Sequence, residues 1–195
     1  MSDRAPDPSR RSERSRQAIL AAAFELLGES GYAKLTIEAI AARAGVGKQT
    51  IYRWWPSKGS VLFDAFLAFG EDRVLELPDT GDLAADLRSV ARSGVDELVN
   101  PRFDLPYRAL LTEVQHDPGL SAELLDQFHG PLLAATKQRL RGAQETGEVA
   151  ADLDLDLAFE LLWGAFYYRW LLRTGPLTHD YADAAVALVL RALSP

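Results

Sequence analysis

The fold is decided by the stretch TIEAIAARAGVGKQTIYRWWPSKG, residues 36–59. Thr36 is a suitable N-cap for a helix whose apolar residues recur at helical spacing and which stops at Gly45. A second helix begins near Lys48, and it cannot continue undisturbed through Pro56. Two short helices separated by so short a turn are typical of a helix-turn-helix, which we therefore predict here.

The second helix of this pair combines an apolar face with a row of hydrogen-bond donors. Val46, Ile51 and Trp55 are spaced to face the interior of the domain, and Trp54 is expected to share part of that role. The side chains that remain for the outer face of this helix are Lys48, Gln49, Thr50, Tyr52 and Arg53, and Lys58 follows at the start of the next helix. In a major groove, lysine can donate to guanine, glutamine can pair with adenine, and threonine can contact a thymine methyl group or a phosphate. Tyrosine, arginine and a lysine at a helix start suit phosphate oxygens. The pattern favours DNA binding over an aromatic core cluster with solvated charges.

Charge is distributed unevenly along the 195 residues. The net charge is −7, yet residues 1–60 hold ten basic and six acidic side chains, whereas residues 61–195 hold eleven and twenty-two. A basic N-terminal module on an acidic body is what a polyanion-binding protein needs. The absence of cysteine excludes disulfides and cysteine zinc sites, and fits a cytoplasmic protein.

The remaining sequence predicts an all-α protein of about nine helices. We predict a disordered arm at 1–12, which is either a solvated terminus or an extra DNA contact. A three-helix helix-turn-helix domain at 13–59 and a helical body at 60–195 follow. Asp82, Ser121, Asp154 and Thr178 are the expected N-caps of body helices. The expected helices lie near 12–30, 36–44, 48–55, 57–77, 82–99, 105–116, 121–146, 154–174 and 178–193. The charged N-terminus lacks the apolar region of a secretory signal, and no run is long enough for a membrane span.

Residues 12–69, and above all GYAKLTIEAIAARAGVGKQTIYRWWPSKGSVLFDAF, resemble the DNA-binding domain of the TetR (tetracycline-repressor) family of transcriptional regulators. The resemblance implies that Thr36 contacts a phosphate, that Lys48, Gln49 and Thr50 face bases, and that Tyr52, Arg53 and Lys58 hold the backbone. Gly47 departs from the family, which often has a serine at this position. A glycine can still cap the helix, but a side-chain contact to phosphate is lost.

The rest of the chain resembles the ligand-binding and dimerising half of such regulators, which implies a homodimer on a palindromic operator and a small-molecule effector. The segment LLWGAFYYRWLLR, 161–173, is apolar all round and must be buried on more than one side. One side is expected to form a dimer seam with the apolar stripe of the last helix, at Ala182, Ala185, Val186, Val189 and Leu190; burial within a monomer is the alternative. Aromatic walls would suit a largely apolar effector. The candidate pocket residues, each of which could instead be plain core, are Phe103, Tyr107, Leu111, Phe128, Trp163, Phe166 and Tyr167.

Other kinds of site find little support in the sequence. The three histidines, at positions 116, 129 and 179, have no spacing typical of a metal site, so we expect no metal and no cofactor. No nucleophile, P-loop or dinucleotide motif is present, which argues against an enzyme. The alternative to a regulator is a helical small-molecule-binding or interaction module in which the helix-turn-helix is only scaffold.

Overall fold

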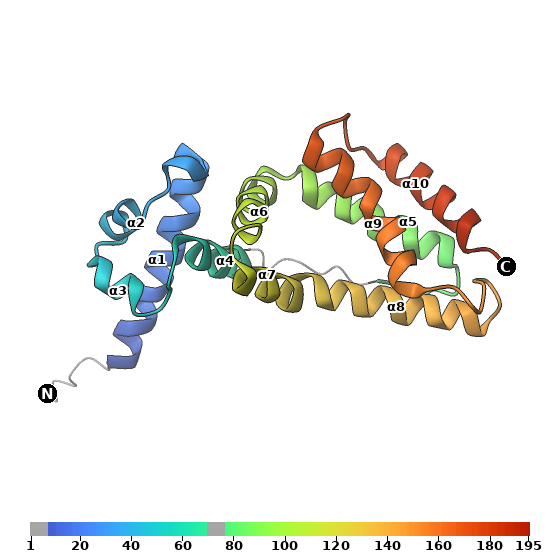
Figure 1. The fold of residues 1–195 in the computed structure, drawn as a ribbon, viewed down its shortest axis with the longest axis horizontal. Coiled ribbons are helices and arrows are strands. Elements are labelled where there is room, and N and C mark those ends of the chain that lie inside the picture. Colours follow the sequence, from blue (N-terminus) through green and yellow to red (C-terminus); the bar gives the residue numbers. More distant parts are fainter. Residues whose placement is uncertain (1–7, 70–76) are drawn as a thin grey trace, which may run out of the picture. The chain divides into compact units, whose positions relative to one another are not determined.

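The computed structural model describes residues 8–69 and 77–195, and within these ranges the chain forms ten α-helices and no β-strand (Figure 1). The predicted all-α class is confirmed. The helices are α1 (Pro8–Ser30), α2 (Ile37–Ala44), α3 (Lys48–Tyr52), α4 (Lys58–Phe69), α5 (Leu83–Val99), α6 (Pro101–Val114), α7 (Pro118–Leu124), α8 (Gly130–Glu145), α9 (Leu155–Leu172) and α10 (His179–Leu193). A 3₁₀ turn, η1 (Tyr32–Lys34), precedes α2, and a π turn, Leu125–His129, separates α7 from α8. None of the helices in the described ranges is long and apolar enough to cross a membrane.

The chain folds into two compact units whose limits differ from the predicted domains. The first contains α1–α4 together with Leu105–Ser121, so α4 and most of α6 belong with the helix-turn-helix. The second contains α5, the first residues of α6 as far as Asp104, and Ala122–Pro195. Leu105–Ser121 joins the first unit because helices distant in sequence can share one core, and the predicted domain boundary at residues 59/60 stays a prediction.

The core of the first unit joins α1, α2 and α3 to α4. The fully buried Ile19, Leu20, Ile40 and Ile51 pack together there, and α1 lies against both α2 and α4. Thr36 caps α2 as expected, its hydroxyl accepting from the amide of Ala39 at 3.1 Å. Removing these apolar surfaces from water at about 25 cal/mol per Å² is what holds three short helices in place.

Two expectations for the N-terminal region need correction. Residues 8–12, predicted as part of a disordered arm, are helical, because Pro8 stands at the first position of α1, where a missing amide costs nothing. Residues 1–7 lie outside the described residues, as do residues 70–76, where helix 57–77 was expected to end. Trp54, expected to share the inward role, is 41 % exposed, whereas Trp55 is 4 % exposed. Trp54 follows the last turn of α3 and turns outward beside Arg53. The guanidinium carbon of Arg53 lies 5.9 Å from the centroid of the Trp54 ring.

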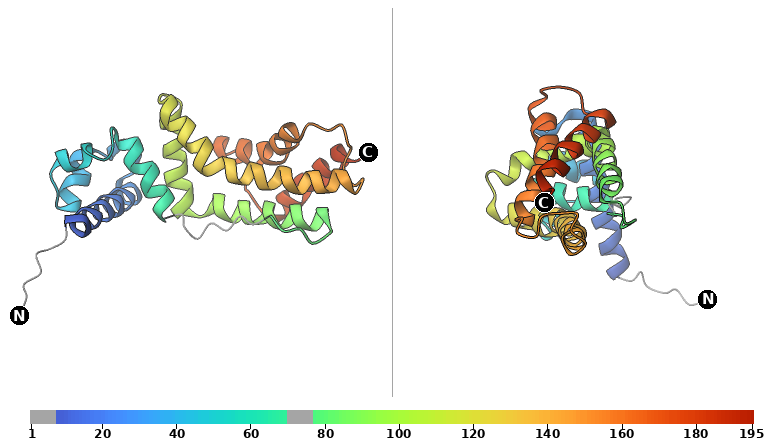
Figure 2. Two further views of the ribbon diagram at one scale, coloured as in Figure 1. Left: turned by 90° about the horizontal axis from the view of Figure 1, so that it is seen from below. Right: turned by 90° about the vertical axis from the view of Figure 1, so that its right-hand side faces the viewer.

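The second unit is built from α5, α8, α9 and α10. Helix α10 packs against α5 and α9, and α8 packs against α9; Figure 2 shows these helices from two further directions. Asp82, Asp154 and Thr178 cap α5, α9 and α10 through their side chains, as predicted. Ser121 does not cap a helix. Asp117 does so instead, accepting from the amide of Leu120 at 3.0 Å, and Pro118 then begins α7.

Candidate DNA-binding surface

The turn between α2 and α3 is made by Gly45, Val46 and Gly47. Gly45 adopts the left-handed conformation, with φ 66° and ψ 33°, and its amide closes the last turn of α2. Val46 donates to the carbonyl of Ala41 at 3.0 Å. Gly47 then caps α3 in an extended conformation without any side-chain hydrogen bond. The cap predicted at Gly47 is therefore made by the backbone alone.

The residues predicted to contact DNA lie mainly at the surface of the first unit. Ile51 and Trp55 are buried beneath them and Val46 packs against the same core, which confirms the expected inward face. The exposed members of the predicted set are Thr36, Lys48, Gln49, Tyr52 and Arg53, and the half-buried ones are Thr50 and Lys58. That these side chains touch DNA stays a prediction.

One exposed carboxylate lies among the predicted donors. Lys48 Nζ donates to Glu38 Oε1 at 3.0 Å, joining the first residue of α3 to the first turn of α2. The hydrogen bond from Lys48 lowers the pKa of Glu38 below its ordinary value, and Glu38 in turn raises the pKa of Lys48. Both groups therefore stay charged at neutral pH. Glu38 was not among the sequence-predicted site residues, since in the first turn of a helix an acidic residue is explained by the helix dipole alone.

Lys58 is held by the aromatic ring beneath it. Its ammonium lies 4.0 Å from the centroid of the Tyr32 ring and 3.5 Å from the carbonyl oxygen of Leu35. Burial and the neighbouring Glu113 carboxylate raise the pKa of Tyr32 well above its ordinary value, so the ring is neutral under all physiological conditions. The contact with the face of this neutral ring attracts the Lys58 ammonium and holds it in place.

The position of α3 depends on a carboxylate that sequence reasoning missed. Asp64, in α4, accepts hydrogen bonds from Trp55 and Arg16, and so ties the end of the α3 segment to α1 and α4. A signal was available in the sequence: Asp64 is the only charged residue between Val61 and Phe69, which otherwise reads as an apolar run. A carboxylate in such a place is expected to have partners.

The predicted effector residues divide between the two units. Tyr107 and Leu111 belong to the first unit, where the Tyr107 ring stacks on Phe66 at 5.7 Å between centroids. In the second unit, Phe103 stacks on Phe128 at 6.0 Å and Trp163 meets Phe166 at 5.8 Å. Most of the set is buried, and only Leu111 and Tyr167 are half-buried. Their role as pocket walls stays a prediction.

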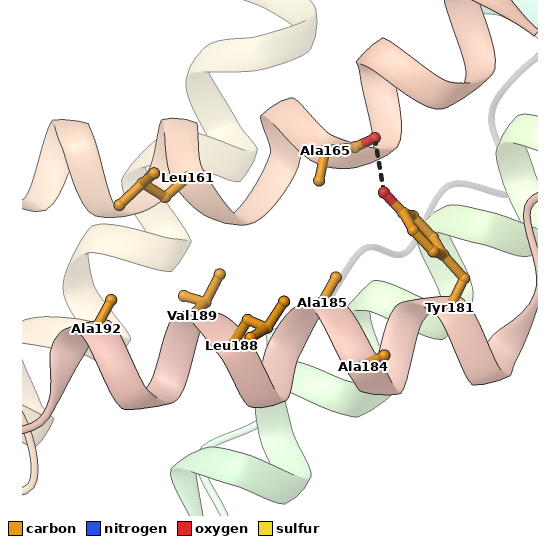
Figure 3. A pocket seen from close by; sticks show the side chains of 8 residues that line it. All are labelled: Leu161, Ala165, Tyr181, Ala184, Ala185, Leu188, Val189 and Ala192. Carbon is orange, nitrogen blue, oxygen red and sulfur yellow. Dashed lines mark hydrogen bonds between the residues drawn. The ribbon is translucent and has the colours of Figure 1, made fainter. Parts of the chain in front are cut away.

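An apolar groove of about 300 Å³ lies between α9 and α10 (Figure 3). Its walls are Leu161, Ala165, Tyr181, Ala184, Ala185, Leu188, Val189 and Ala192. The Tyr181 hydroxyl donates to the carbonyl of Ala165 at 3.2 Å and closes one end. The predicted seam on α10 is thus partly wrong, because Ala182 and Val186 are fully buried in the protomer's own core. The exposed face of α10 instead carries Ala184, Leu188 and Ala192, which lie beside the predicted residues around the helix axis.

A helix-turn-helix with exposed donors, carried by an all-helical body, defines the class of helix-turn-helix transcriptional regulators. Comparison with known proteins identifies the family within this class. Residues 19–65 match the family model described as bacterial regulatory proteins, tetR family, and residues 77–189 match the tetracyclin repressor-like C-terminal domain. The chain belongs to the TetR family of transcriptional regulators.

Individual relatives agree with this assignment along most of the chain. The HTH-type transcriptional regulator YdeS of Bacillus subtilis is 35 % identical, over 87 % of this chain and 84 % of its own length. The DNA-binding transcriptional repressor TetR of Mycobacteroides abscessus is 31 % identical, over 94 % and 95 %. Among solved structures, the TetR family regulator SCO0332 matches with a TM-score of 0.70 and 34 % identity, covering 93 % of this chain and 99 % of its own. SmeT, solved as a triclosan complex, shares the fold with a TM-score of 0.65 at 23 % identity, over 93 % and 92 %.

Proposed function

We propose that this protein is a homodimeric, cytoplasmic repressor that binds a palindromic operator and is released from it by a small, mostly apolar effector. The observation that carries the proposal is the α3 segment, where polar donors occupy the exposed side of a helix whose other side is buried. Each subunit would place α3 in the major groove of one half-site. The two recognition helices of a dimer would then be about 35 Å apart, or a multiple of that distance.

The assembly we propose uses the exposed faces of α9 and α10. Apolar or glycine residues are exposed along α9 at helical spacing, at Leu157, Leu161, Gly164, Tyr168, Leu171 and Leu172. The exposed Leu188 of α10 adjoins this stripe across the groove. A continuous apolar face of this kind is costly in water, and pairing it with the same face of a second copy satisfies both.

The proposed release is a population shift between two dimer geometries. An effector bound in the helical body would tilt α4 and change the separation of the two recognition helices, so that they no longer match the half-sites. Aromatic side chains in the body support an apolar effector, and SmeT, which shares the fold, was solved as a triclosan complex. The repressor role is supported by the relative from Mycobacteroides abscessus, which is a DNA-binding transcriptional repressor.

Selection of bound sites from random double-stranded DNA tests the proposal directly. The expected result is a palindromic consensus whose half-sites are one helical turn, or a multiple, apart. The alternative function, a helical small-molecule-binding or interaction module with the helix-turn-helix as scaffold, predicts no enriched sequence and no salt-sensitive complex. That outcome would refute the repressor.

A further inference from the structure

The ion pair between Lys48 and Glu38 is an anomaly on a surface that faces a polyanion. A carboxylate there repels phosphates and cancels the charge that Lys48 would offer them. Both side chains are largely exposed, with 53 % and 64 % of their surfaces accessible, and exposed pairs of this kind contribute little to stability. The helix dipole favours an acidic residue at Glu38, but it does not require a lysine partner from the predicted DNA contacts, and non-specific attraction to DNA does not account for the pair.

The pair matches one order of groups on a base-pair edge. In the major groove, a G·C pair presents the O6 acceptor of guanine next to the N4 donor of cytosine, and a T·A pair presents the O4 acceptor of thymine next to the N6 donor of adenine in the same order. In each base pair the two atoms are hydrogen-bonded to each other, so they lie about 3 Å apart. Lys48 Nζ and Glu38 Oε1 are 3.0 Å apart and present a donor beside an acceptor. Donor meets acceptor at both positions when the ion pair approaches the edge head-on.

We propose that Lys48 and Glu38 act together as one reader of the order of keto and amino groups in a single base pair. The ammonium donates to guanine O6 or thymine O4, and the carboxylate accepts from the amino group of the paired cytosine or adenine. The proposal rests on the proposed DNA-binding function and adds to it a specificity-determining residue, Glu38, outside the recognition helix. A C·G or A·T pair presents the donor and the acceptor in the reverse order, so the same two atoms would face a mismatched edge. Because the pair is neutral as a whole, it reads sequence without adding to the salt dependence of binding.

The neighbouring ion pair of the same domain supplies a matched control. Arg43 in α2 bonds Glu29 in α1 through two nitrogens, at 2.7 and 2.9 Å, and both side chains are exposed. It resembles the Lys48–Glu38 pair in charge, exposure and proximity to α2, but neither residue belongs to the predicted DNA contacts. A change that acts only through surface charge should have the same effect at both pairs.

The experiment measures affinities of the full-length protein for its selected operator and for operators changed at one position at a time. Wild type is expected to lose about tenfold or more when the base pair at one position of each half-site is changed from G·C or T·A to C·G or A·T, and much less when G·C and T·A are exchanged. With G·C at that position, N4-methylcytosine, which places a methyl group where the major-groove hydrogen was, should weaken binding similarly. Glu38→Ala should abolish both effects at that position and leave preferences elsewhere intact. Glu29→Ala should retain the wild-type profile, and circular dichroism checks the fold of each variant.

Two results would overturn the inference while leaving the regulator in place. In one, Glu38→Ala keeps the wild-type base preference and changes affinity for all sequences by the same factor. In the other, wild type binds a defined operator, but no position of it accepts both G·C and T·A while rejecting C·G and A·T. A wild-type protein without any specific operator would instead refute the proposed function itself, so the two failures are distinguishable.

Discussion

The indole Nε1 of Trp55 donates a 2.9 Å hydrogen bond to Oδ2 of Asp64, and the same oxygen accepts from Arg16 Nη2 at 2.9 Å. One carboxylate oxygen thereby joins three segments: α1, the chain just after α3, and α4. Trp55 is a large apolar group that seats the recognition helix, and its nitrogen also fixes the direction of the ring. A phenylalanine could do the first but not the second.

We predict that Trp55→Phe lowers the free energy of unfolding by about 2 kcal/mol, because the hydrogen bond to a carboxylate is lost and the smaller ring leaves space. Urea denaturation measures this. Trp54→Phe is the matched control, since Trp54 is exposed and makes no such bond; its effect should stay within about 0.5 kcal/mol. Equal losses in the two variants would show that the bond to Asp64 contributes nothing.

Local features of this fold could be predicted from sequence because their causes are local. Thr36, Asp154 and Thr178 cap helices through atoms within three residues of themselves, and Gly45 takes a conformation that few other residues tolerate. The N-cap predicted at Ser121 was wrong for a related, local reason. Asp117, four residues earlier, is followed by Pro118, and this combination is the stronger helix start.

Features that depend on distant partners could not be predicted. Glu38 and Lys48 are ten residues apart, and Asp64 meets Arg16 across forty-eight, so only the folded chain reveals either pair. Membership of Leu105–Ser121 in the first unit is likewise a property of packing rather than of composition. The π turn Leu125–His129, which divides a helix predicted as continuous over 121–146, is different, because Pro131 directly after it cannot donate to a helix interior and was an available signal.

Lys58 and Gln49 should affect DNA binding in different ways. Lys58→Ala is expected to weaken binding to all sequences and to reduce the slope of log affinity against log salt by about 0.9, the value for one phosphate contact. Gln49→Ala should alter the preferred base at one position and leave the slope unchanged. Affinities measured at several salt concentrations separate the two effects. An unchanged slope for Lys58→Ala would remove it from the phosphate contacts.

Gly94 in α5 permits a close approach that no other residue allows. A Cβ atom there would lie 2.6 and 2.9 Å from two ring carbons of the buried Trp163. Gly94→Ala should therefore destabilise the protein by about 1–3 kcal/mol, as overpacking of a core does. Gly142→Ala in α8 is the control, since a Cβ there meets nothing within 4 Å, and it should stabilise by about 0.5–1 kcal/mol. The same sign for both in urea denaturation would refute the steric argument.

Asp86 and Arg139 form a buried ion pair that makes stability depend on pH. Asp86 accepts from Arg139 Nε at 2.8 Å and from the Thr80 hydroxyl at 2.7 Å. Burial disfavours its charged form, but the hydrogen bonds from Thr80 and Arg139 outweigh burial and lower the pKa of Asp86 below its ordinary value. Its charge therefore stabilises the fold above the unfolded-state pKa of about 3.9, and that contribution is lost as the pH falls through the lower folded-state value.

The expected result is a difference in unfolding free energy between wild type and Asp86→Asn that is constant above about pH 5 and shrinks below about pH 4. Arg139→Met, which leaves the buried carboxylate without its cation, should cost about 3 kcal/mol at neutral pH. Asp152→Asn, at an exposed position, is the control and should differ little from wild type throughout. A difference for Asp86→Asn that grows toward acid pH would contradict the direction of the pKa shift.

The proposed dimer face predicts a selective effect of charge. Leu188 is 65 % exposed and lines the groove between α9 and α10, whereas Leu125 is 59 % exposed and does not line it. Leu188→Glu would place two carboxylates in an apolar interface, one from each subunit, where no cation compensates them within the groove lining. Sedimentation equilibrium should then report monomers for Leu188→Glu and dimers for Leu125→Glu. Operator affinity should fall only for Leu188→Glu, since a single recognition helix binds one half-site. Dimers of Leu188→Glu as stable as those of wild type would move the interface elsewhere.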